Sequence, residues 1–238
     1  MKDHIQIGDI TIDVERKTIK NLHLSVHPPT GSVTISAPDR MQLDTIRVYA
    51  VSKLDWIKNQ QRKLREQNRE TPREYLERES HYLWGKRYLL SVREVDSPPS
   101  VKLDHARMIL AVRPGTGIEK RQKILERFYR TQLKEKIPEL IRHWEPRIGV
   151  KVAGFYVQRM KTKWGSCTCQ KGTIRLNTEL AKKPLSCLEY LIVHEMVHLI
   201  EPTHNQRFIA LMDHHLPNWR LTRNVLNDLP VRHENWKY

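Results

Sequence analysis

The sequence predicts an α+β fold, in which β-rich segments and long helices alternate along a chain of 238 residues. Residues 4–37 alternate between apolar and polar side chains, as half-buried strands do. Residues 41–69 and 117–147 instead repeat their apolar side chains at helical spacing. The length suits one large domain, or a small domain joined to a larger one.

The first part of the chain, residues 1–149, is expected to be a β-rich region with two long helices. Its first strands alternate around a turn at Gly8 and Asp9. The first helix, over residues 41–69, carries an apolar stripe made of Leu43, Ile46, Val51, Leu54 and Ile57. Residues 81–112 return to strand-like patterns that prolines interrupt.

The second long helix, over residues 117–147, is strongly basic between its apolar positions. The apolar positions are Ile124, Leu125, Phe128, Leu133, Ile137 and Leu140. The basic ones are Lys120, Arg121, Lys123, Arg127, Arg130, Lys134 and Lys136. A basic helix face is either solvated or bound to an anionic partner, and the sequence leaves both interpretations open. This helix is the best candidate in the sequence for an anionic contact.

Residues 150–238 are expected to form a separate domain, because the pattern of the chain changes at this point. Two segments, 152–160 and 172–177, are typical of strands, with a turn or hairpin between them. A helix then begins at Pro184, or at Ser186 with a capping glutamate three residues later.

The helix that follows is apolar almost all the way round, which predicts that it is buried. Its apolar residues are Leu188, Leu191, Ile192, Val193, Met196, Val197, Leu199 and Ile200. A further helix is expected after Asn205, whose side chain suits an N-cap.

The net charge of +15 indicates attraction to polyanions, nucleic acid above all. No recognisable nucleic-acid-binding module accompanies this charge. One explanation of the charge is a nucleic-acid partner that contacts a basic surface. Solubility alone is the simpler explanation.

The compartment is expected to be the cytoplasm. Cys167, Cys169 and Cys187 form an odd set, which fits a reducing environment better than a disulfide framework. The sequence has no apolar run of eighteen residues and no pattern of a secretion signal at its start. We expect no membrane partner, and the sequence does not indicate an oligomeric state.

Residues 194–198 read H-E-M-V-H, which fits the metal-binding pattern H-E-x-x-H. On a helix, His194 and His198 lie one turn apart on the same face. Glu195 lies about 100° further round, near enough to contact a water molecule at the metal without being a ligand. Two buried histidines and a buried glutamate need partners, and a divalent ion supplies them together.

His204 is the predicted third ligand, provided that the chain turns. In a continuous helix His204 would lie about 9 Å further along the axis than His198 and could not reach the same ion. Pro202 ends the helix, since it lacks an amide hydrogen and disfavours helical geometry at Glu201. The alternative third ligands are Glu201, Asp213, His214 and His215.

Three protein ligands leave one position open for water, which is typical of a catalytic rather than a structural zinc. We expect one zinc ion per chain, although imidazole also suits other divalent transition metals. Glu195 would act as the general base during attack on a carbonyl, so the reaction is metal-assisted hydrolysis with peptide bonds as the leading target. A non-enzymatic nucleic-acid-binding protein with a structural zinc is an alternative. The candidates for assisting the ion at the oxyanion are Arg159, Lys161, Lys163 and Tyr190.

The segment K-W-G-S-C, residues 163–167, suggests tight packing at a turn. Cys167 and Cys169 are possible metal ligands, but two cysteines one residue apart on a strand point to opposite faces. We also expect residues 172–177 to offer an edge strand to an extended peptide.

Four segments, residues 159–167, 172–177, 193–204 and 217–220, together resemble the YgjP-like metallopeptidase family. The resemblance is strong over residues 150–228. It implies a zincin-like catalytic domain, in which the H-E-x-x-H helix packs on a small twisted sheet. It further implies zinc held by His194, His198 and His204, with Glu195 as the catalytic base.

The family resemblance also widens the set of possible substrates. The family is related to SprT-type proteases, and with the basic charge this relation suggests protease action near nucleic acid. Some members of the family are described as nucleotide pyrophosphatases that act on UTP. A UTP pyrophosphohydrolase that uses the same metal site is therefore a further alternative. The sequence shows no glycine-rich phosphate loop and no carboxylate cluster suited to Mg²⁺, which argues against that alternative.

Overall fold

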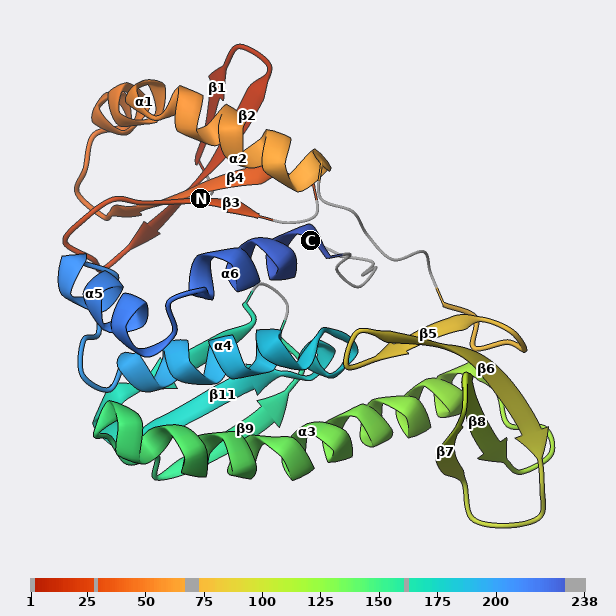
Figure 1. The fold of residues 1–238 in the computed structure, drawn as a ribbon. Coiled ribbons are helices and arrows are strands. Elements are labelled where there is room, and N and C mark those ends of the chain that lie inside the picture. The colour runs from red at the N-terminus through yellow and green to blue at the C-terminus, as the bar shows by residue number, and fades with distance from the viewer. Residues whose placement is uncertain (1–2, 28–29, 67–72, 161–162, 230–238) are drawn as a thin grey trace. The chain divides into compact units, whose positions relative to one another are not determined.

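The computed structural model describes residues 3–27, 30–66, 73–160 and 163–229 (Figure 1). These residues form two compact units, which divide in the stretch between residues 66 and 73. Both units combine helices with small sheets, so the predicted α+β fold is confirmed. The predicted boundary near residue 149 falls inside the second unit, and a separate domain over 150–238 stays a prediction.

The first unit is a four-stranded sheet with two helices, and the strand order is β1-β2-β4-β3. Its elements are β1 (Asp3–Ile7), β2 (Ile10–Lys17), β3 (His23–His27), β4 (Ser32–Pro38), α1 (Leu43–Ser52) and α2 (Leu54–Glu66). Alternate residues of β2 and β4 are buried beside Ile46, Ala50 and Ile57. The helix predicted over 41–69 is in fact two helices, because Lys53 leaves helical geometry at φ −106°.

The second unit begins with another four-stranded sheet, in the order β5-β6-β8-β7, and continues into a long helix. The elements are β5 (Ser80–Leu83), β6 (Lys86–Glu94), β7 (Ser100–Asp104), β8 (Arg107–Val112) and α3 (Ile118–Ile148). Helix α3 agrees with the predicted span within one residue at each end. It ends at Gly149, whose positive φ of 76° suits a left-handed cap.

A three-stranded sheet and three helices complete the second unit. They are β9 (Gly154–Gln158), β10 (Gly165–Thr168), β11 (Thr173–Asn177), α4 (Leu185–Val197), α5 (Gln206–His215) and α6 (Trp219–Asp228), with short 3-10 turns η1 (Cys169–Lys171) and η2 (Thr178–Lys182). The strand order is β10-β11-β9. The expectation of an edge strand at 172–177 is therefore wrong, because β11 pairs on both sides and β10 is at an edge.

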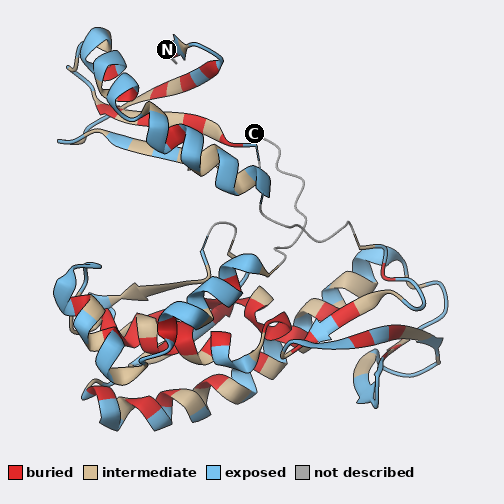
Figure 2. Ribbon diagram, turned by 45° about the horizontal axis from the view of Figure 1, so that its top comes forward, coloured by how far each residue is buried: buried red, intermediate tan, exposed pale blue. Residues whose placement is uncertain are grey.

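Helix α4 packs against α3, α5, α6 and the three-stranded sheet, at the centre of the second unit (Figure 1). Nine of its residues are buried, as its uniformly apolar sequence predicts. Figure 2 shows the buried residues gathered along α4 and the neighbouring elements. The indole N–H of Trp144 in α3 donates to Glu189 of α4 at 3.0 Å, which ties the two helices together. No helix in the described part of the chain is long and apolar enough to cross a membrane.

Candidate metal centre

Three imidazole rings meet at the end of α4. His194 belongs to its last turn, His198 is the residue that caps its end, and His204 lies in the loop before α5. One nitrogen of each ring lies within 4.8 Å of the corresponding nitrogens of the other two. The Nε2 atoms of His194 and His204 are 3.1 Å apart, so these two rings direct the same nitrogen to one point. The structure thus brings together the three ligands that the sequence predicts.

The chain turns back because the helix ends between His198 and Pro202. The amide of Glu201 donates to the carbonyl of Val197 at 2.9 Å, in the last bond of helical type. Pro202 has no N–H with which to continue to the carbonyl of His198. That carbonyl instead accepts from the thiol of Cys169 at 3.2 Å. The Cys169 side chain from η1 therefore takes the place of the next helical hydrogen bond. The loop that follows can then bring His204 back to the first two histidines.

The alternative third ligands are held elsewhere. The Glu201 carboxylate accepts from the hydroxyl of Thr203 at 2.9 Å, which directs it along the loop. The Asp213 carboxylate accepts from the indole of Trp219 and from Arg220. Among the described residues, only the three histidines form a group that could hold a metal ion. This group includes none of the four alternatives, which are Glu201, Asp213, His214 and His215.

The ring of Phe208 packs against all three imidazoles and keeps them in place. Its centroid lies 5.0 Å from that of His194, 4.6 Å from that of His198 and 4.7 Å from that of His204. Phe208 is 2% exposed. Its amide donates to the Asn205 side chain at 3.0 Å, which confirms the predicted N-cap. The cap is evident from the sequence, whereas the role of Phe208, three residues further on, is not.

Burial and hydrogen bonding prepare the imidazoles to act as neutral ligands. Burial, followed by the proximity of His198 and His204, lowers the pKa of His194 to about 3. The Nδ1–H of His198 donates to the carbonyl of Glu201 at 3.0 Å, which leaves its Nε2 with a free lone pair. Nitrogen ligands of a tetrahedral ion lie about 3.3 Å apart, close to the separation of the two Nε2 atoms described above. The donor set therefore fits a divalent metal ion.

Glu195 is the only carboxylate of the described residues that is buried beside the histidines, with 4% exposure. Its side chain lies over the backbone of Gly165 at the start of β10. Burial raises the pKa of Glu195 to about 8, and the positive charge of Lys163 opposes this shift. The structure thus places the predicted base between α4 and the edge strand β10.

Tyr190 and Arg223 also lie beside the centre. The Tyr190 ring lies 5.8 Å from that of His194 and stacks on Trp219 of α6 at 6.3 Å. The positive charge of Arg223, one turn after Trp219 on α6, lowers the pKa values of His194 and His204 after the larger effects of burial and neighbouring histidines. The sequence does not indicate Arg223, because only the packing of α6 on α4 brings it to this place.

The other candidates for assisting at the oxyanion are distributed differently. Lys163 lies close enough to Glu195 to affect its pKa. Arg159 lines a separate pocket, described below. Lys161 falls outside the described residues. Of the residues considered from the sequence, Lys163 and Tyr190 therefore remain beside the centre.

Cys167 and Cys169 are close together, contrary to the expectation that they point to opposite faces. Their sulfur atoms are 3.9 Å apart. The reason is that β10 ends at Thr168, so Cys169 starts the 3-10 turn η1 and no longer follows the alternation of a strand. Burial raises the pKa of Cys167 to about 12, so its thiol is protonated at neutral pH. Neither cysteine belongs to the group of possible metal ligands in the described residues.

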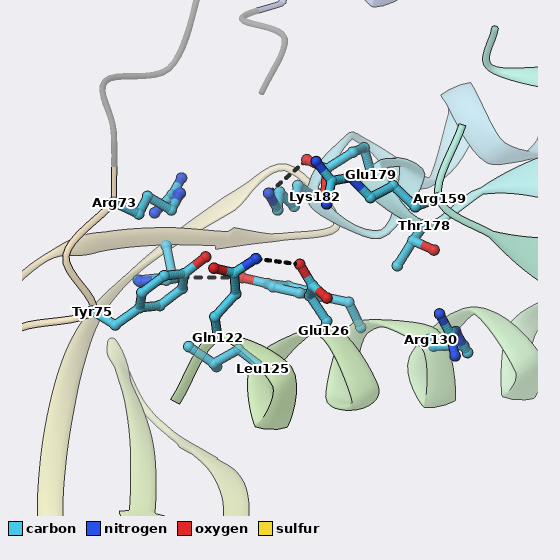
Figure 3. A pocket seen from close by; sticks show the side chains of 12 residues that line it. Arg73, Tyr75, Gln122, Leu125, Glu126, Arg130, Arg159, Thr178, Glu179 and Lys182 are labelled. Carbon is cyan, nitrogen blue, oxygen red and sulfur yellow. Dashed lines mark hydrogen bonds and ion pairs between the residues drawn. The ribbon is translucent and has the colours of Figure 1, made fainter. Parts of the chain in front are cut away.

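A second, polar pocket lies between α3, β5 and η2 (Figure 3). Its walls are joined by hydrogen bonds, from Lys182 to Glu179 at 2.6 Å and from Gln122 to Glu126 at 2.9 Å. The room inside, about 20 Å³, is little more than one water molecule needs. No residue of the metal centre lines this pocket, and we interpret it as a structural network.

The known proteins to which this chain is similar include a family and two solved structures. The family model described as "YgjP-like, metallopeptidase domain" matches residues 20–229. Among solved structures, the metallopeptidase zymogen abylysin of Pyrococcus abyssi is 20% identical, with a TM-score of 0.34 over 37% of this chain and 87% of that chain. The metallopeptidase zymogen jannalysin of Methanocaldococcus jannaschii is 18% identical, with a TM-score of 0.33 over 37% of this chain and 93% of that chain.

A search of curated proteins found no match. The family match, by contrast, spans most of the chain and includes every residue of the metal centre. The chain belongs to the YgjP-like metallopeptidase family, and it is a metal-dependent hydrolase.

Proposed function

We propose that the protein is a zinc-dependent peptidase in which His194, His198 and His204 hold one zinc ion and Glu195 is the general base. The observation that carries this proposal is the convergence of three imidazole nitrogens within 4.8 Å, next to a buried carboxylate. A set of three neutral imidazoles suits zinc, with one position left for water or substrate. We further propose that the residues that carry out this activity all lie within residues 150–238.

In the proposed reaction, the metal ion and the side chains of the protein have separate roles. A zinc ion held here would act as a Lewis acid and make a water molecule more acidic. Next to the positive charge of such an ion, Glu195 would be ionised in spite of its burial. Its carboxylate takes the proton from the attacking water and later passes it to the leaving amine. Phe208 and the Glu201 carbonyl fix the orientation of the imidazoles, which is the role of outer groups at metal sites.

The edge strand β10 is suited to hold an extended peptide. It pairs with β11 on one side, and no strand of the described residues pairs with its other side. It begins at Gly165, directly beside the carboxylate of Glu195. A peptide that adds to this edge by backbone hydrogen bonds would pass the base, and this arrangement favours peptide hydrolysis.

The test is a comparison of the wild type with Glu195→Gln on a mixed peptide library and on nucleoside triphosphates including UTP. We expect peptide cleavage by the wild type, a loss of about 10²–10⁴-fold in the variant, and unchanged metal content measured by elemental analysis. If only UTP turnover depends on Glu195, the protein is a pyrophosphohydrolase. If neither activity depends on it, Glu195 is not the base.

A further inference from the structure

A groove of about 710 Å³ runs between α3 and the part of the chain formed by β7 and the loop after β8. No acidic side chain lines this groove. Four basic side chains line it: Arg113, Lys120, Lys123 and Arg127. All of its lining residues belong to the second unit, and none belongs to the metal centre. The groove is therefore a second concave surface with its own charge.

The basic side chains follow one face of α3. Lys120, Lys123 and Arg127 are spaced three and four residues apart, so they lie along one stripe, about 4.5 and 6 Å from one another along the helix axis. Arg113 faces them from the loop after β8. All four are exposed, and none forms an ion pair with another described residue. Like charges so close together repel each other, and an anionic partner would remove this repulsion.

The floor of the groove is apolar. Val101, Ile124 and Phe128 are half-buried there and pack on the core of the second unit. Phe128 directly follows Arg127, about 100° further round the helix, and lies one turn after Ile124, so its ring borders the stripe of cations. An apolar, partly aromatic floor between positive walls is the arrangement that accepts stacked bases while lysines and arginines contact the phosphates.

We propose that this groove binds single-stranded nucleic acid, with its four cations on phosphates and Phe128 against a base. A single strand fits better than a duplex, because α3 is a wall of the groove and does not protrude as a helix that enters a major groove must. The aromatic floor favours nucleic acid over an acidic peptide, which would use only the cations. This proposal does not depend on the activity of Glu195.

The experiment measures the binding of the full-length protein to a fluorescent oligodeoxythymidylate of about 12 nucleotides, by anisotropy at several salt concentrations. The wild type is compared with Lys123→Gln/Arg127→Gln. The matched control is Arg142→Gln/Lys151→Gln, which removes two exposed positive charges of the same unit outside the groove. Circular dichroism verifies the folding of each protein. Cleavage of a small peptide should be equal in all three, which separates this result from the proposed peptidase function.

Four phosphate contacts to a single strand predict a log–log salt slope of about −2.8, or about 50-fold weaker binding between about 50 and 200 mM salt. The groove variant should show a slope of about −1.4, and the control should keep the wild-type slope. Equal losses in both variants, or no loss in the groove variant, would overturn the proposal. So would tighter binding of a duplex, or competition by polyglutamate as effective as that by unlabelled oligonucleotide.

Discussion

The carboxylate of Glu195 occupies the space in which any residue other than glycine at position 165 would place its side chain. A Cβ atom added to Gly165 would lie 2.5 Å from Oε1 of Glu195 and 3.1 Å from its Cδ. The backbone of β10 thus forms one wall around the proposed base. This contact gives a physical reason for the glycine in K-W-G-S-C, for which the sequence indicated only tight packing.

The first prediction concerns this contact. Gly165→Ala should displace the carboxylate by a fraction of an ångström to about 1 Å and lower kcat for peptide cleavage by up to about 10²-fold. Metal content should stay at one ion per chain, because no ligand changes. Gly154→Ala is the control, since its added Cβ would meet only a Thr173 methyl group at 3.9 Å. Equal kcat values for the two variants would show that Glu195 does not need the space at Gly165.

The second prediction tests the turn before His204. Pro202→Ala restores an N–H that can bond to the carbonyl of His198 and extend the last turn of α4. We expect the affinity for zinc to fall about tenfold or more, although every ligand is retained. Competition with a chromophoric chelator measures this affinity. An affinity equal to that of the wild type would mean that the loop folds back without help from the proline.

The third prediction concerns the packing of Phe208 on the histidines. Phe208→Ala should lower the free energy of unfolding by about 3–5 kcal/mol and also weaken zinc binding, because the three rings lose their common support. Met212→Ala, a change at a fully buried position of the same helix, should cost similar stability but leave zinc affinity unchanged. Both quantities are measured at a temperature where circular dichroism shows each variant folded. Equal zinc affinities would argue against a positioning role.

The fourth prediction assigns a role to Arg223. Its positive charge acts on Tyr190, His194 and His204, so it is placed to stabilise negative charge that develops on a substrate. Arg223→Ala should reduce kcat/KM for peptides by about 10–10²-fold with full metal content, and Arg223→Lys should recover much of the loss. Steady-state kinetics on one peptide decides the question. If alanine and lysine behave alike, charge is not what Arg223 contributes.

The fifth prediction addresses the buried ion pair of the polar pocket. Lys182 and Glu179 are 2.6 Å apart, with side chains only 7% and 12% exposed. Glu179→Ala should lower the free energy of unfolding by about 3 kcal/mol, because it leaves the lysine buried without this partner. Removing both charges in Glu179→Gln/Lys182→Met should cost less. Urea denaturation measures both changes, and a larger loss in the double variant would contradict the explanation.

The candidate ligands could be predicted from the sequence because local rules determine most of their placement. Helical spacing puts His194 and His198 on one face, and Pro202 marks where the helix has to end. Phe208 and Arg223 could not be predicted in this way. They come from α5 and α6, and their distance to the histidines depends on how these helices pack against α4.

The errors in the predicted fold have a related cause. The alternation of residues 172–177 indicates a strand, but it does not reveal how many neighbours that strand has. Likewise, the apolar stripe over 41–69 continues through Lys53, although the backbone breaks there. The close approach of Cys167 and Cys169 depends on a strand end at Thr168 that alternation alone does not indicate.

Helix α3 has a consequence for any attempt to isolate the catalytic part by truncation. Its 31 residues extend over about 46 Å, and it buries side chains from Leu125 to its last residue, Ile148. A fragment that starts at residue 150 would lose the Trp144–Glu189 hydrogen bond and uncover the side of α4 that α3 protects. Such a fragment should be insoluble, whereas one that starts near residue 73 retains the helix. Expression trials of the metallopeptidase unit should therefore cut the chain before β5.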